Sequence, residues 1–145
     1  MGASTAAFDH VSHMTTTRRA QLRARALQVI SEQCWHPQFD EDALAGVLDV
    51  SRKTLDRTFS EGESVAYAIG RARVQRVRRS LLCGQCRSVR VASEAAGFTS
   101  LGAMKFHFRR VFDETPLQLQ RRLRHQENDV SSAPRWSHGA TGAWL

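Results

Sequence analysis

Four charged side chains cluster in one short stretch where each could face outward from the same helix. Ser51 can begin that helix, and the charged residues after it are Arg52, Lys53, Asp56 and Arg57. The planar fork of Arg57 suits guanine O6 and N7 or a phosphate group. Asp56 could accept a hydrogen bond from a cytosine amino group, or it could orient Arg52 or Arg57. The chemistry predicted for this stretch is recognition of DNA.

A downstream stretch mixes polar and apolar side chains in a similar arrangement. Arg109 and Arg110 come late in its expected helix, where phosphate contact is favoured over base readout. Leu101 and Phe106 are apolar members of this stretch. Phe106 should point outward, toward a thymine methyl group or a protein partner, with burial as the alternative. The complete set of outward candidates is Leu101, Lys105, Phe106, His107, Arg109 and Arg110.

The charge of the chain favours an anionic partner. Its formal net charge is +7 and its sequence pI is about 10.6. No acidic residue lies between Glu63 and Glu94, whereas seven arginines do. Such a field of one sign repels itself unless an anion neutralises it, although a solvated basic surface is the alternative.

Several other classes of protein are disfavoured. No apolar run approaches the roughly 18 residues of a membrane span, so we expect a soluble, cytoplasmic, nucleoid-associated protein without membrane contact. The histidines are scattered and no phosphate-binding glycine loop is evident, so we expect no catalytic residues and no cofactor. Cys83 and Cys86 have the spacing of a metal or redox pair, but Cys34 and His36 are remote in sequence. We expect no metal; a thiol sensor is the more plausible alternative.

The candidate residues require short helices to position them. Asp40 and Ser51 are suitable N-caps, and Asp49 can adopt the left-handed turn between the two helices that they begin. Downstream, Gly97 supplies the turn and Ser100 the cap. A shift of 49 residues aligns three pairs of cap and inner-face residues, which favours an internal duplication: Ser51 with Ser100, Leu55 with Met104, and Phe59 with Phe108.

A long helix over residues 64–84 should join the two copies. At 100° per residue, Val65, Ile69 and Ala72 lie on one side of it. Val74, Val77 and Leu81 lie on nearly the opposite side, which indicates packing against two different cores. The nineteen residues from Ser64 to Leu82 would span roughly 28 Å, close to the separation of about 34 Å between successive major-groove openings.

Across residues 27–122 the chain resembles the AraC/XylS family of bacterial transcription regulators. The most specific matches are Ser88-Val89, Gly97-Phe98, Phe108-Arg109 and Thr115-Pro116, together with residues 44–59. The resemblance implies an all-α, homeodomain-like fold, with two helix-turn-helix subdomains joined by a linker helix and bound to consecutive major grooves of double-stranded DNA. It also implies contact with RNA polymerase as an activator.

Departures from the family pattern predict unequal halves. Met104 replaces an aromatic residue or leucine, and Phe106 replaces an arginine. In the internal alignment Lys53 corresponds to Gly102, and Arg57 to Phe106. We therefore expect the first helix-turn-helix to dominate base readout. The alternative is a protein-interaction module that uses Leu101 and Phe106 and binds DNA only non-specifically.

The predicted organisation has five parts. They are a disordered leader (1–17), a first helix-turn-helix subdomain (18–63), a linker helix (64–84), a second helix-turn-helix subdomain (85–124) and a flexible tail (125–145). Many relatives carry a separate ligand-binding domain. The protein could therefore respond through its abundance or a partner, or the sequence could be one domain of a longer chain.

Overall fold

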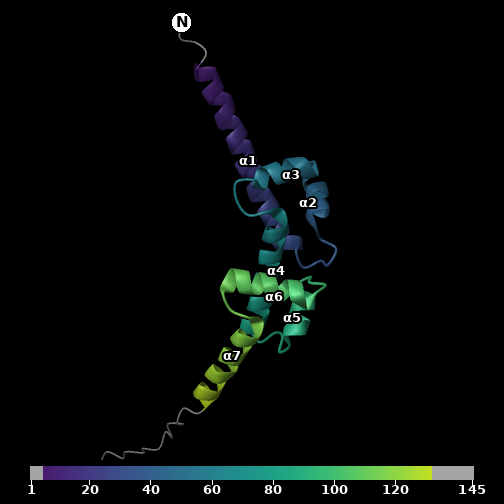
Figure 1. Cartoon of the computed structure of the whole chain (residues 1–145), viewed down its shortest axis with the longest axis vertical. Helices are drawn as coiled ribbons and strands as arrows, with labels where there is room; N and C mark the ends of the chain where they lie inside the picture. Colours follow the sequence, from purple (N-terminus) through teal and green to yellow (C-terminus); the bar gives the residue numbers. More distant parts are fainter. Residues whose placement is uncertain (1–4, 132–145) are drawn as a thin grey trace, which may run out of the picture.

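Helices form the described part of the chain, which in this computed structural model comprises residues 5–131, with side chains described for residues 15–127. Figure 1 shows an elongated molecule in which two groups of short helices lie one after the other along the long axis. In chain order they are α1 (Thr5–Gln33), α2 (Glu41–Leu48), α3 (Arg52–Phe59), α4 (Val65–Leu82), α5 (Val89–Ala95), α6 (Leu101–Phe112) and α7 (Pro116–Ser131). The predicted all-α class is confirmed.

The expected helix caps are present. Oδ1 of Asp40 accepts a hydrogen bond from Ala43 N at 2.9 Å, and Oγ of Ser51 accepts one from Thr54 N at 3.1 Å. Ser100 caps α6 in the same way. These acceptors satisfy amides that have no partner within the first helical turn. They fix where α2, α3 and α6 begin, and therefore which side chains face outward.

Two separate groups of buried side chains lie at opposite ends of α4. The first core combines α1, α2, α3 and the N-terminal half of α4; among its most buried members are Ile30, Leu44, Leu55, Phe59 and Val65. The second core combines the C-terminal half of α4 with α5, α6 and α7; among its most buried members are Val74, Val77, Met104, Phe108 and Leu119. The predicted change of apolar side along the linker helix is confirmed.

Helix α2 buries Leu44 and Leu48, whereas Val47 is exposed. An eight-residue helix that packs against one core buries a single narrow stripe, and Val47 falls outside it.

The prediction of a disordered leader is wrong for residues 5–17, which belong to α1. The sequence has neither proline nor glycine between Thr5 and Gln33, so no residue there interrupts the helical hydrogen bonds that start in the packed part. Figure 1 shows this N-terminal part of α1 extending beyond α2 and α3.

The prediction of a flexible tail is wrong for residues 125–131, because α7 continues to Ser131. A capping box begins this helix: Thr115 N donates to Oε1 of Gln118 at 2.7 Å, and Gln118 N donates to Oγ1 of Thr115 at 3.2 Å. Pro116 occupies the first helical position, where its missing amide removes no helical bond. The remainder of the predicted tail, which includes Trp136 and Trp144, lies outside the described residues.

Candidate nucleic-acid interface

Helix α3 presents a cationic outer face. Leu55 and Phe59 hold its inner face in the first core, while Lys53 and Arg57 are exposed. Within the described part of the chain, no hydrogen bond or ion pair engages the side chain of Lys53 or Arg57. Both cations are therefore available to an external anion or base edge without breaking an internal contact.

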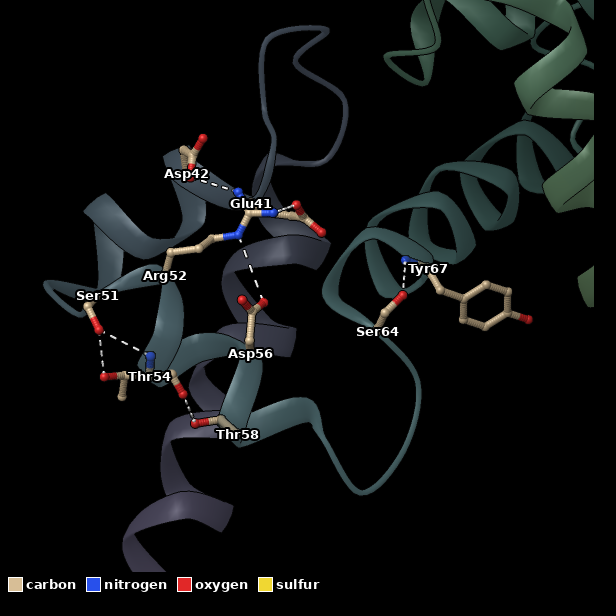
Figure 2. Close-up of polar contacts among 9 residues, drawn as sticks. All are labelled: Glu41, Asp42, Ser51, Arg52, Thr54, Asp56, Thr58, Ser64 and Tyr67. Carbon is tan, nitrogen blue, oxygen red and sulfur yellow. Dashed lines mark hydrogen bonds and ion pairs between the residues drawn. The ribbon is translucent and has the colours of Figure 1, made fainter.

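Arg52, by contrast, is held by acidic side chains of its own domain. Its Nη2 pairs with Glu41, its Nη1 donates to Asp42 Oδ1 at 2.8 Å, and its Nε lies 3.9 Å from Asp56 Oδ1. Figure 2 shows the guanidinium between these three carboxylates, bridging the start of α2 and the outer face of α3. The arrangement favours the orienting role for Asp56 over a cytosine contact. Sequence spacing gave no signal for Glu41 and Asp42 as partners.

Helix α6 is also anchored by inner residues and open on its outer face. Met104 and Phe108 are fully buried, whereas Lys105, Phe106 and Arg109 are exposed. Phe106 is 60% exposed, so burial, one of its three predicted states, is excluded in the described structure. Leu101 packs partly against the second core, which reduces the surface that it offers to a partner.

Two residues predicted for the outer face of α6 also contact α4, although Arg110 remains exposed. The His107 ring is half-buried and lies against Gly70, where a Cβ atom would come within 2.4 Å of it. The Arg110 guanidinium lies 4.7 Å from the centre of the Tyr67 ring. Both contacts belong to the packing of α6 on α4, because at this crossing the two helices approach closely over a glycine.

The environment of His107 predicts a pH-dependent stability. Burial, and then the neighbouring Arg110 and Arg73 charges, lower the pKa of His107 below the usual 6.5. The unfolded chain therefore takes up this proton more readily than the folded chain. The contribution of neutral His107 to the free energy of unfolding should be fully present above about pH 6.5. It should decline below that pH, until the pH reaches the folded-state pKa. Chemical denaturation of the wild type between about pH 7 and pH 5 measures this decline.

The variant His107→Gln should show a smaller decline over that pH range. His36→Gln, which removes an exposed histidine, is the matched control. Equal pH slopes for His107→Gln and the wild type would show that His107 is not the titrating group.

The arginine-rich window is less available to a partner than the sequence suggested. Arg71 pairs with Glu63 at 2.6 Å, and the guanidinium of Arg78 lies 5.1 Å from the centre of the Phe112 ring. Arg73 donates to backbone carbonyls, and Arg76 is half-buried. The exposed members of the window are Arg79, Arg87 and Arg90. The absence of acidic residues in this window therefore overestimates the free positive charge, because some of its arginines contact carbonyl groups, aromatic rings or Glu63.

The three cysteines are not brought together as one site. Cys34 is buried in the first core, which raises the pKa of its thiol; Cys83 is exposed, and Cys86 packs at the second core. No group of three or more metal-ligating side chains that could hold an ion occurs within the described residues. In that same part of the chain, no helix combines the length and apolar character needed to cross a membrane.

Residues 44–122 match the family described as "Helix-turn-helix domain". Comparison with curated proteins found no match. The C-terminal domain of AraT, a response regulator from Geobacillus stearothermophilus, is similar in structure, with a TM-score of 0.62 and 20% identity over 70% of this chain and 84% of that one.

Two further solved structures are similar over much of the chain. A DNA-binding transcriptional dual regulator from Escherichia coli K-12 has a TM-score of 0.61 and 22% identity, covering 70% of this chain and 96% of its own. A Listeria innocua protein of unknown function has a TM-score of 0.60 and 19% identity, covering 68% and 93%. At these identities the likenesses show a shared fold.

Proposed function

Because the chain belongs to the helix-turn-helix domain family, in its AraC/XylS type, a family of DNA-binding transcription regulators, we propose that it regulates transcription by placing α3 and α6 in successive major grooves. One observation carries this proposal: two helices with exposed cationic side chains are anchored in separate cores at the two ends of α4. The 18 residues of α4 span about 27 Å, which suits grooves that open about 34 Å apart.

The proposal includes the finer features that the family resemblance implies. The two reading units correspond to residues 18–63 and 85–124, and the separate cores support that division. The regulator acts as an activator that contacts RNA polymerase, in the cytoplasm and on the nucleoid.

We assign most base readout to α3. Arg57 and Lys53 project from it without internal partners in the described structure, whereas α6 carries Leu101, Gly102 and Phe106 at the comparable outer positions. A guanidinium can distinguish guanine from the other bases by about 1–3 kcal/mol, while an apolar ring offers contact only with a thymine methyl group. The second helix then contributes affinity and register through Lys105 and Arg109.

The exposure of Phe106 supports a second candidate function. A large aromatic side chain that is 60% exposed on an outer helix face can anchor a protein partner. In that case the second unit binds protein, and the chain adheres to DNA without sequence preference. The salt dependence and the sequence dependence of DNA binding separate the two functions.

Phosphate contact by Arg109 predicts a specific change in salt dependence. Arg109→Ala should weaken binding to all duplexes by a similar factor, and it should reduce the slope of log K against log salt concentration by about 1. Fluorescence anisotropy with a labelled duplex over a range of salt concentrations measures both quantities.

The matched control is Arg71→Ala, which removes the same charge from a site already paired with Glu63. Its salt slope should stay near the wild-type value. A slope for Arg109→Ala that equals the slope for Arg71→Ala would contradict the assigned phosphate contact.

A further inference from the structure

Arg73 lies in the middle of α4, between the residues that enter the two cores. Its Nε donates to the carbonyl of Cys34 at 2.7 Å, and its Nη2 donates to the carbonyls of His36 at 3.0 Å and Phe39 at 2.9 Å. These acceptors belong to residues 34–39, the segment that joins α1 to α2 in the first half of the molecule. One guanidinium therefore fixes this segment to the linker helix, through bonds strengthened by its charge.

The second half of the molecule also packs against Arg73 and against the segment that Arg73 binds. The Arg73 guanidinium lies 5.8 Å from the centre of the Phe98 ring, and Phe98 belongs to the second core. Gly97, just before it, has φ +90°, and a Cβ atom there would lie 2.6 Å from the carbonyl oxygen of Cys34 and 2.7 Å from that of Trp35. The turn between α5 and α6 thus packs closely on the backbone at the end of α1.

A second close approach lies beside Arg73. The His107 ring of α6 lies against Gly70 of α4, less than one helical turn from Arg73. Arg73, Gly70 and His107 also line one cavity of about 260 Å³ at this junction. Several close contacts between the two halves therefore lie around Arg73, which bonds to one half and lies against an aromatic ring of the other.

We propose that Arg73 is a positioning residue that holds α3 and α6 at one fixed separation and orientation, so that the protein reads its two DNA boxes at one spacing. The inference rests on the proposed function, in which α3 and α6 are the reading helices. Each inserted base pair shifts the second box by about 3.4 Å and turns it by about a tenth of a helical turn. A rigid junction cannot follow such a shift, whereas a loose junction can.

The distance between the two reading helices in the free protein tests the inference without DNA. Spin labels are placed at Lys53→Cys and Lys105→Cys, with Cys83→Ser and Cys86→Ser; Cys34 is retained because it is buried. Pulsed electron–electron double resonance should give one narrow distance distribution between the two spin labels when Arg73 is present. Arg73→Met, which keeps an unbranched stem but removes the guanidinium and its three carbonyl bonds, should broaden the distribution at least twofold. An unchanged distribution in this variant, or a broad one with Arg73 present, would overturn the inference.

Two further variants keep the test decisive if Arg73→Met fails to fold. Arg73→Lys retains the charge but not the fork, and should give an intermediate width. Gly70→Ala should displace α6 and shift the mean distance, because its Cβ would lie 2.4 Å from the His107 ring. Gly46→Ala, where a Cβ meets nothing within 4 Å, is the matched control and should leave the distribution unchanged. Wild-type distributions for both Arg73→Lys and Gly70→Ala would also overturn the inference.

The affinity for duplexes with altered spacers between the two boxes is the second measurement. One inserted base pair should weaken wild-type binding about tenfold, and should weaken Arg73→Met binding less than threefold. If Arg73→Met lost affinity by the same factor at every spacing, Arg73 would have a purely stabilising role, and this would overturn the inference. The wild type could show no preferred DNA site while its distance distribution remained narrow and dependent on Arg73. That result would contradict the proposed function but would still support the role of Arg73 in fixing the separation of α3 and α6.

Discussion

Replacing Phe108 with alanine is expected to lower the free energy of unfolding by about 3–5 kcal/mol. Phe108 is fully buried in the second core, and its ring meets that of Phe112 edge-on at 4.8 Å. The substitution loses the transfer free energy of a large side chain and leaves a cavity beside α4. Because domains of this size are stable by only about 5–15 kcal/mol, a large part of the total stability should disappear. Urea denaturation followed by circular dichroism measures the change.

The same helix provides the matched control. Phe106→Ala removes an identical side chain two positions away, from a site that is 60% exposed. Its free energy of unfolding should stay within about 0.5 kcal/mol of the wild type, as for most surface substitutions. If Phe106→Ala destabilised the protein as much as Phe108→Ala, α6 would be rotated relative to the structure, and its outer face would have to be reassigned.

Replacing Arg57 with alanine is expected to remove most of the sequence preference of DNA binding. A bidentate pairing of this guanidinium with a guanine contributes about 1–3 kcal/mol of discrimination, which corresponds to about five- to 150-fold in affinity for the preferred site. Binding to a random duplex should change far less, because only one positive charge is lost. Competition between a preferred duplex and random duplexes measures the ratio of the two affinities.

Arg52→Ala and Arg109→Ala are the comparison variants. Arg52 is already held by Glu41 and Asp42, so its loss should alter the preferred sequence less than the loss of Arg57 does. Arg109→Ala should lower the affinity for all sequences alike. If Arg109→Ala changed the preferred sequence and Arg57→Ala did not, the roles of the two helices would be reversed.

Local sequence signals predicted the fold well where they act over a few residues. The capping serines, the left-handed turn at Asp49 (φ 54°) and the glycine turn at Gly97 (φ +90°) all occur in the structure, because each depends only on neighbouring backbone. The two stripes of the linker helix were visible for the same reason. The ends of the chain were predicted less well, since composition alone suggested disorder where α1 and α7 continue. The Thr115–Gln118 capping box was a signal for α7 that the prediction did not use.

Contacts between distant residues were beyond the reach of the sequence. Arg73 and the segment at residues 34–39 are far apart along the chain, and nothing in their spacing shows that the guanidinium meets three carbonyl groups. The inward turn of His107 likewise depends on Gly70, in a different helix. Counting arginines gave the charge of the surface but not its distribution, because internal pairing is decided by the tertiary fold.

We propose that two helices of one chain read DNA in successive grooves, with α3 dominant. Selection from randomised duplexes near physiological salt, followed by sequencing of the bound pool, tests it most directly. We expect one sharply defined box, with a more tolerant box about one helical turn away at a constant spacing. A pool without an enriched sequence, and binding that vanishes as salt rises, would contradict sequence-specific regulation by this chain.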